Sequence, residues 1–324
     1  MQQKGKNNML YLGIDTSMYT TSIAVVNNCK ELVQEERRVL EVPIGERGMA
    51  QSEALFKHLQ VLPELLRLIP TSTWQRIKAI AVSTRPRPIE GSYMPVFTAG
   101  KSIALSLAAA LGVELTSTSH QEGHIVAGLN SLEESIGREF LAVHLSGGTT
   151  ELLVVRKTSP GRFNIEILGE STDLHAGQFV DRVGVSLGLP FPAGKDLEKL
   201  ALKATPGAAS LLPSSVKGYE MSFSGVESAA QRLLETNKRP ADVARAVEGC
   251  IVRTLFKVLT KAIEETGLSN ILVVGGVASN KYIRAELAKK VGTKGRLYWA
   301  KPEWSSDNAI GVALIAQEVP TANY

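Results

Sequence analysis

One pattern occurs twice in this chain of 324 residues, and this repetition constrains the fold most strongly. Four segments have the apolar composition of buried strands: residues 9–13, 21–26, 139–145 and 151–155. The first two flank the polar tip Asp15-Thr16-Ser17, and the last two flank Ser146-Gly147-Gly148-Thr149-Thr150. Strands and helices alternate after each pair, as in α/β proteins. We therefore predict two similar lobes, residues 1–134 and 135–324, with a ligand in the cleft between them.

Helical spacing of apolar residues marks much of the rest of the chain. The predicted helices cover residues 51–69, 98–111, 177–187, 195–203, 240–266 and 307–317. Residues 77–83 and 270–274 read as further buried strands, and a helix follows from Lys281. The last helix, residues 307–317, is a candidate to pack back on the first lobe.

The composition restricts the class of protein. Hydrophobic residues make up 44% and charged residues 21%, which is typical of a globular protein. The net charge of +4 permits contact with nucleic acid or nucleotide but does not require it. The chain holds no apolar run long enough for a membrane span and no signal peptide, and its two cysteines, Cys29 and Cys250, are far apart. We expect reduced thiols, a cytoplasmic location and no membrane partner.

Three glycine-containing or hydroxyl-containing loops favour nucleotide binding. Besides the two tips, Gly275-Gly276 follows an apolar strand and opens a helix. Glycine lets backbone amides approach a phosphate, and hydroxyls add donors. No Walker loop is present, and a tight turn explains each loop alone about as well. Asn280 either contacts a ribose or caps the following helix, and the sequence leaves both open.

The stretch from Ser119 to His124 contains two of the five histidines. His120 and His124 are four residues apart, so on a helix both imidazoles point the same way and can bind one divalent metal. The competing interpretation is a helix whose first turn merely contains two histidines. Asp307 precedes the last helix and is either its N-terminal cap or the carboxylate that completes a two-histidine metal site.

The remaining polar residues in apolar surroundings carry weaker signals. We expect His58 at the surface or at a helix cap, and His144 as a strand residue beside the second tip. His175 is a candidate to line the cleft. Asp181 interrupts an apolar helix face and either pairs with a neighbour or faces a ligand. Ser222-Phe223-Ser224-Gly225 lacks the nucleophile elbow GxSxG, so we interpret it as a turn that packs or binds.

Taken in order, these motifs resemble those of the TsaD family, the threonylcarbamoyl-transfer subunit of tRNA modification. The matching stretches are Gly13-Ile14-Asp15-Thr16-Ser17, His120-Gln121-Glu122-Gly123-His124, Ser146-Gly147-Gly148-Thr149-Thr150, Asp181 with Gly188-Leu189-Pro190-Phe191-Pro192, Ser222-Phe223-Ser224-Gly225, Gly275-Gly276-Val277-Ala278-Ser279-Asn280 and Asp307-Asn308. The match runs over nearly the whole chain.

The resemblance implies an α/β, two-lobed actin-like fold (ASKHA, ribonuclease H-like), with ATP or an acyl-adenylate in the cleft. It implies one divalent metal, iron or zinc, on His120, His124 and Asp307, and contacts from Asp181, Gly194 and Asn280 to the adenosine half of the ligand. The family transfers a threonylcarbamoyl group from threonylcarbamoyl-AMP to the anticodon-adjacent adenosine of tRNA. Its implied partners are tRNA, a TsaB-like subunit and a TsaE-like ATPase.

The chain departs from the family pattern near the implied metal, ligand and tRNA. The differing positions are Met18, Tyr19, Thr20, the loop from Arg85 to Tyr93, Thr149, Gln178, Ala193 and Glu227. The first three stand where the family usually has Cys-Asp-Glu, so acidic charge near the implied metal is lost, and Glu227 reverses the charge of a lysine. A second hypothesis follows: a nucleotide-binding scaffold or regulatory paralogue without transferase activity.

Overall fold

The computed structural model describes residues 9–17, 19–42, 49–305 and 308–319, and it contains two five-stranded sheets built on one plan. The strand order of the first sheet is β3-β2-β1-β4-β5. Strands β1, β2 and β3 are antiparallel, whereas β4 and β5 run parallel to β1. The bounds are β1 Leu10–Ser17, β2 Thr20–Asn27, β3 Leu32–Val39, β4 Ile77–Arg85 and β5 Glu114–Ser119.

The second sheet repeats this arrangement strand for strand. Its order is β12-β11-β6-β7-β8, with β6, β7 and β8 antiparallel and with β11 and β12 parallel to β6. The bounds are β6 Glu139–Leu145, β7 Thr150–Ser159, β8 Arg162–Glu170, β11 Asn270–Val274 and β12 Arg296–Trp299. The two predicted polar tips therefore occupy equivalent places, at the turns β1–β2 and β6–β7.

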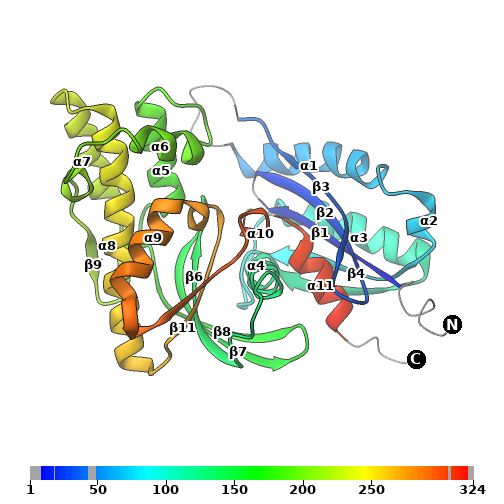
Figure 1. Cartoon of the computed structure of the whole chain (residues 1–324). Helices are drawn as coiled ribbons and strands as arrows, with labels where there is room; N and C mark the ends of the chain where they lie inside the picture. Colours follow the sequence, from blue (N-terminus) through cyan, green and yellow to red (C-terminus); the bar gives the residue numbers. More distant parts are fainter. Residues whose placement is uncertain (1–8, 18, 43–48, 306–307, 320–324) are drawn as a thin grey trace.

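Helices cover both sheets (Figure 1). Their bounds are α1 Gln51–Leu66, α2 Thr71–Trp74, α3 Phe97–Leu111, α4 His120–Asn130, α5 Ala176–Ser186, α6 Gly194–Ala201, α7 Ser224–Glu235, α8 Pro240–Thr266, α9 Lys281–Val291, α10 Pro302–Ser305 and α11 Ile310–Glu318. A small hairpin is formed by β9 Ser215–Lys217 and β10 Glu220–Ser222. None of the described helices is both long and apolar enough to cross a membrane.

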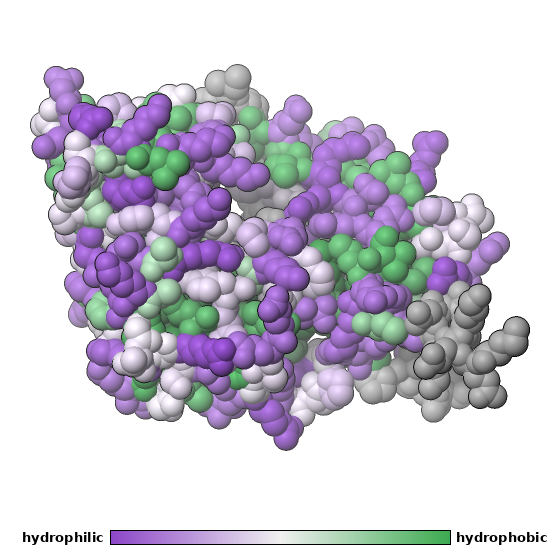
Figure 2. All heavy atoms as spheres, viewed as in Figure 1, coloured by the Kyte–Doolittle hydropathy of each residue, from purple (hydrophilic) through white to green (hydrophobic). Residues whose placement is uncertain are grey.

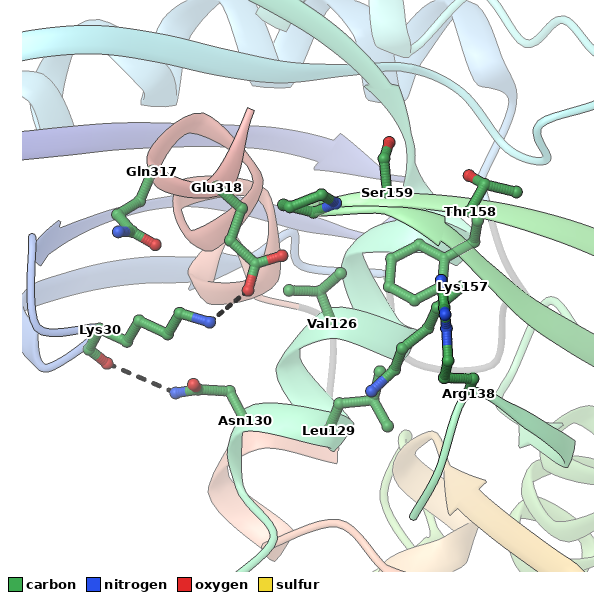
Figure 3. Close-up of a pocket in the computed structure, with 13 residues that line it drawn as sticks. Lys30, Val126, Leu129, Asn130, Arg138, Lys157, Thr158, Ser159, Gln317 and Glu318 are labelled. Atoms are coloured by element: carbon green, nitrogen blue, oxygen red, sulfur yellow. Dashed lines mark hydrogen bonds and ion pairs between the residues drawn. The ribbon is translucent and has the colours of Figure 1, made fainter. Parts of the chain in front are cut away.

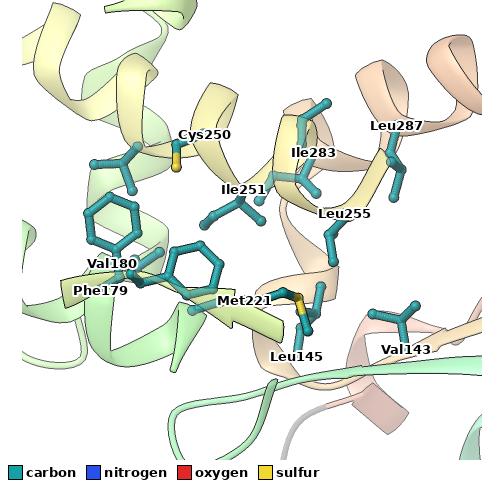
Figure 4. Packing of buried hydrophobic residues seen from close by; sticks show 14 of the residues in the cluster. Val143, Leu145, Phe179, Val180, Met221, Cys250, Ile251, Leu255, Ile283 and Leu287 are labelled. Atoms are coloured by element: carbon teal, nitrogen blue, oxygen red, sulfur yellow. The ribbon is translucent and has the colours of Figure 1, made fainter. Parts of the chain in front are cut away.

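The largest core lies between the second sheet and helices α5, α8 and α9. Val143 and Leu145 of β6 face Ile251 and Leu255 of α8 across this core, and Phe179 of α5 closes one end (Figure 4). Burying such a side chain contributes about 1.5–3 kcal/mol to the free energy of unfolding. The surface by contrast is mostly hydrophilic on the face drawn in Figure 2, with apolar side chains in small patches.

Helix α4 is shared between the two sheets. Ile125 packs with residues of the second sheet, whereas Val126 packs with α11 and β2 of the first. The approach of α11 is very close: a Cβ on Gly311 would lie 1.8 Å from the backbone oxygen of Gly123 in α4. A Cβ on Gly13 of β1 would lie 2.3 Å from the backbone nitrogen of Ala313. Glycine at these positions lets α4, α11 and β1 pack backbone against backbone.

We predict that Gly311→Ala lowers the free energy of unfolding by about 1–3 kcal/mol, because a methyl group forces α4 and α11 apart. Urea denaturation measures the change. Gly225→Ala in α7 is the matched control, since a Cβ there meets nothing within 4 Å and alanine favours a helix. Equal stability of the two variants would contradict the proposed packing constraint.

Candidate functional site

The first turn of α4 is fixed by a capping box. The Ser119 hydroxyl accepts a hydrogen bond from the Glu122 backbone N–H at 3.1 Å, and the Glu122 carboxylate accepts one from the Ser119 N–H at 2.9 Å. Both residues are buried. These reciprocal bonds satisfy donors that the helix start leaves without partners, so the turn that carries His120 and His124 has a defined position.

The predicted histidine pair lies at this turn. The Nε2 atoms of His120 and His124 are 3.0 Å apart, and Nδ1 of His120 lies 2.8 Å from Oδ2 of Asp15. Two nitrogens on one tetrahedral zinc are about 3.3 Å apart when each Zn–N bond is about 2.0–2.1 Å. A carboxylate hydrogen-bonded to the other ring nitrogen, here Nδ1, is the arrangement that orients a metal-binding imidazole. The 3.0 Å separation is that of a hydrogen bond between the two rings, and it is also close to the spacing of two ligands of one metal.

Asp15 belongs to a buried polar group at the end of β1. Its carboxylate accepts hydrogen bonds from the Ser83 hydroxyl and the Ser17 backbone N–H, both at 2.8 Å. Neighbouring Thr16 is fully buried, and its hydroxyl donates to the Val96 carbonyl at 3.0 Å. Two of the three polar residues of the first tip thus bond within the protein: Asp15 contacts His120, and Thr16 contacts Val96.

A third imidazole lies beside the pair. The ring centre of His144, on β6, is 4.5 Å from that of His124 and 6.5 Å from that of His120, and the residue is 2% exposed. The sequence gives no ligand spacing for His144, because the contact crosses between a strand and a helix. The only available signal was its place one residue before the end of a strand that leads into the second tip.

The third predicted metal ligand, Asp307, and the substitution at Met18 lie outside the described residues. Within residues 9–17, 19–42, 49–305 and 308–319, no three His, Cys, Asp or Glu side chains already form a metal-ligand set. The expectation for His58 is wrong: this residue of α1 is fully buried, and its Nδ1 lies 2.7 Å from the Thr21 hydroxyl of β2. The hydroxyl partner makes burial of the imidazole possible.

The second tip is exposed at its two glycines, and the Gly148 N–H donates to the Ser146 hydroxyl oxygen at 3.3 Å. Gly147 and Gly148 are exposed, and Ser146 closes the turn by donating its N–H to the Thr149 carbonyl at 2.8 Å. Gly275 has a φ of 98° and passes so close to Leu145 that a Cβ would lie 2.2 Å from its backbone oxygen. The structure thus brings the loop of Gly275 and Gly276 to the base of the second tip.

The residues implied to contact adenosine lie on α5, α6 and the start of α9. The Asp181 carboxylate accepts a hydrogen bond from the Ala193 N–H at 2.8 Å, and burial raises its pKa to about 6. Gly194 is the first residue of α6. Asn280 is the N-cap of α9: its side-chain oxygen accepts from the Ile283 N–H at 2.9 Å, and its amide donates to Glu248 at 2.7 Å.

Glu248 is a functional candidate that the sequence did not reveal. It is fully buried on α8, and burial raises its pKa to about 7 against the opposing effects of Asn280 and Arg245. Arg245 pairs with it at 2.7 Å. A buried carboxylate that titrates near neutral pH beside a predicted ligand contact is characteristic of binding and catalytic sites.

The turn Ser222-Phe223-Ser224-Gly225 wraps around Asp173. The Ser222 hydroxyl donates to the Asp173 carboxylate at 2.6 Å, the Ser224 hydroxyl also donates to it, and the Phe223 N–H donates at 2.9 Å. Burial acts to raise the pKa of Asp173, but these hydrogen bonds outweigh it and lower the pKa well below the usual range. The serines therefore hold a carboxylate, which agrees with a turn that packs or binds.

The loop after β4 fastens the first sheet to the second. Arg87 forms ion pairs with Glu151 of β7 and, at 2.8 Å, with Glu170 of β8. Gln121 completes the connection, because its side chain donates to Glu151 and its backbone N–H donates to the Pro86 carbonyl at 3.0 Å. Glu151 is fully buried, and burial raises its pKa although Arg87 acts to lower it. We call Arg87, Gln121, Glu151 and Glu170 the interlobe ion cluster.

We predict that Arg87→Gln lowers the free energy of unfolding by about 1–3 kcal/mol at pH 8. This is less than for a fully buried ion pair, because the guanidinium is partly exposed. The folded-state pKa of Glu151 lies above 4.5 and rises further without Arg87. Well below pH 4.5 the carboxyl is protonated in both folded and unfolded states, so the loss is small there and grows as the pH rises. Urea denaturation across this range measures the dependence.

The control for this prediction is Arg156→Gln, which removes an exposed guanidinium from surface pairs with Glu139 and Glu166. It should change the stability little. The double variant Arg87→Gln with Glu151→Gln should regain part of the loss at pH 8, because it buries no unpaired charge. A loss from Arg87→Gln that is equal at pH 4 and pH 8 would count against the interlobe ion cluster.

Solved structures of similar fold share this two-lobed architecture. The activator of 2-hydroxyisocaproyl-CoA dehydratase from Clostridium difficile with bound ADPNP matches with a TM-score of 0.55 and 16% identity, over 95% of this chain and 94% of that chain. A ROK family glucokinase from Streptomyces griseus in complex with glucose and AMPPNP matches with a TM-score of 0.53 and 12% identity, over 95% and 99%. At these identities the likeness shows the fold alone.

These matches confirm the predicted actin-like, ASKHA fold of two lobes. A further match is component A of (R)-2-hydroxyglutaryl-CoA dehydratase from Acidaminococcus fermentans, with a TM-score of 0.57 and 15% identity over 95% of this chain and 98% of that chain. The sequence itself matches the family model of TsaD, tRNA N6-adenosine threonylcarbamoyltransferase, over residues 44–314. That match spans most of the chain and agrees with the motifs from His120 to Asn280, and the chain belongs to the TsaD family.

Proposed function

We propose that this chain transfers a threonylcarbamoyl group from threonylcarbamoyl-AMP to the anticodon-adjacent adenosine of tRNA. The observation that carries the proposal is the imidazole pair of His120 and His124, oriented by Asp15 and lying beside His144, one residue before the end of the strand that leads into the second tip. Family membership supports a role related to threonylcarbamoyl transfer. The partners would be tRNA, a TsaB-like subunit and a TsaE-like ATPase.

The adenylate would lie between the lobes with its phosphate at the second tip. The amide of exposed Gly147 and the hydroxyls of Ser146 and Thr149 would supply donors to a phosphate oxygen, whereas the Gly148 N–H already donates to Ser146. Gly275 and Gly276 supply a backbone wall beside it, and Asp181, Gly194 and Asn280 would contact the adenosine. Ser17 has a buried hydroxyl with no partner among the described residues, which makes it a further donor at the first tip.

In the transfer itself, the exocyclic amine of the adenosine attacks the carbamoyl carbon. A carbon–nitrogen bond forms, the bond from that carbon to the phosphate oxygen breaks, AMP leaves with the electron pair, and the amine loses a proton to solvent. Holding both reactants in the cleft supplies much of the acceleration. Donors at the second tip stabilise the charge that develops on the leaving phosphate.

His120, His124 and Asp307 would hold one divalent metal, iron or zinc. A bound metal supplies a Lewis acid that stabilises negative charge on carbonyl and phosphate oxygens. Asp15 keeps the His120 ring oriented through Nδ1, which leaves Nε2 facing Nε2 of His124. The residues fit this role because both imidazole nitrogens converge on one point.

The alternative is a nucleotide-binding scaffold or regulatory paralogue without transferase activity. The interlobe ion cluster favours it, because Arg87 comes from the loop that departs from the family pattern and ties the lobes together. Tyr19, at another departure, packs edge-on against Phe191 with ring centres 6.1 Å apart. Both contacts restrict the opening of the cleft, through which the adenosine of a tRNA must enter.

The metal is tested by analysis of the purified protein. We expect about one iron or zinc ion per chain, reduced at least tenfold in His124→Ala, because loss of one of few protein ligands removes most of the affinity. His58→Asn is the control, since it removes a histidine that packs against Thr21 and leaves the imidazole pair intact. Full metal content in His124→Ala would remove this residue from the site.

The activity is tested in a bacterium depleted of its own transferase. The chain is expressed with the partner subunits, and the modified adenosine is measured by mass spectrometry. We expect the chain to restore the modification and His120→Ala to reduce it at least a hundredfold, if the site supplies about 3 kcal/mol of transition-state stabilisation. No restoration by a chain that retains its metal and binds nucleotide would favour the scaffold.

A further inference from the structure

A hollow lies at the opposite end of α4 from the histidines. It has a volume of about 650 Å³, within the range of small-molecule sites. Its walls come from the β2–β3 turn, the end of α4, the segment before β6, the β7–β8 hairpin and the end of α11 (Figure 3). Helix α4 has 11 residues, so about 15 Å of helix separates this hollow from His120.

The charge of the hollow is positive. Lys30, Arg138 and Lys157 line it, against the single carboxylate of Glu318. Lys30 pairs with Glu318, as the dashed line in Figure 3 shows. The side chains of Arg138 and Lys157 make no ion pair or hydrogen bond with any residue in the described part of the chain. Burial lowers the pKa of Lys157, and the nearby Lys30 charge adds to that effect, against the opposing Glu318 charge.

An anion would correct this imbalance. Lys157 is half-buried, so its ammonium has lost part of its hydration, and the Glu318 carboxylate that opposes this effect is already paired with Lys30. The hydroxyls of Thr158 and Ser159 line the same hollow and add neutral donors. Lysine, arginine and hydroxyl groups together are the donors that phosphate oxygens accept from most strongly. The apolar part of the hollow favours an organic phosphate ester over inorganic phosphate. Val126, Leu129 and Phe163 form this apolar wall.

We propose that this hollow is a binding site for a small phosphate ester, with Arg138 and Lys157 as its anchoring cations. The site is separate from the cleft and does not depend on the proposed transfer. Its walls belong to both halves of the molecule, since Lys30 and Glu318 lie with the first sheet and Arg138 and Lys157 with the second. A ligand held by both sets of residues would brace the two lobes against each other at the end of α4.

Inorganic phosphate is the probe for the test, with binding measured by calorimetry on the full chain. Ser146→Ala is measured alongside, because it removes a hydroxyl of the second tip and weakens any phosphate bound in the cleft without touching the hollow. We expect phosphate to bind, and we expect Lys157→Met and Arg138→Gln each to weaken it by about tenfold, the effect of one charge-assisted hydrogen bond. Methionine keeps the apolar stem of Lys157, and Arg138 is exposed, so at least one variant retains the fold.

Lys101→Met is the matched control, because it removes an exposed lysine from α3 and should leave phosphate binding unchanged. Three results would overturn the proposal: no phosphate binding to the unaltered chain, equal binding by the chain and both variants, or binding that Ser146→Ala weakens as much as Lys157→Met does. Failure of the transferase assay alone would leave these measurements unaffected. A metal-free His124→Ala protein that still binds phosphate would show that the two sites are independent.

Discussion

The backbone contact of α11 with α4 and β1 is the constraint on which the candidate site depends. Gly311 and Gly13 allow this contact, and a side chain at either position would overlap the opposing backbone. Through it the C-terminal helix packs on the first sheet, while α4 keeps its other side on the second sheet. The imidazole pair at the start of α4 is thereby held between the lobes. A small displacement of α11 would move this turn relative to both tips.

Local signals explain why much of the fold was predictable. Helix α8 begins and ends where the sequence places it, because Pro240 suits a first helical position and Gly267 adopts a φ of 73° at the end. Strand β3 escaped prediction, since Leu32–Val39 is a charged and largely exposed edge strand without an apolar face. Strands β5, β8 and β12 were missed as well. The partners of β5 and β12 lie across a helix in the sequence, which a periodicity does not record, whereas β8 is the hairpin partner of β7 and a partly exposed edge strand.

The same division applies to the site. The pairing of His120 with His124 follows from the helical repeat, whereas the approach of His144 and the bond from Asp15 to His120 require the tertiary fold. The sequence leaves open whether Asn280 caps a helix or contacts a ribose, and in the structure its side chain caps α9. The expectation of His144 as a strand residue beside the second tip is confirmed. Its contact with His124, like the burial of His58 against Thr21, depends on a neighbour from another element, and the sequence gives no sign of either.

The two connections between the lobes differ in physical kind, and this difference bears on how the cleft opens. The packing of α4 and α11 is apolar and backbone-close, so separating them would expose apolar surface and leave voids. The interlobe ion cluster by contrast is stabilised by ion pairs. Glu170 is partly exposed, so an anionic group of a ligand can replace it as the partner of Arg87 without exposing apolar core. Opening is therefore expected at the loop of Arg87, with α4 as the fixed side. On this view the departure of that loop from the family pattern affects how easily the lobes separate at Arg87 and leaves the proposed metal ligands unchanged.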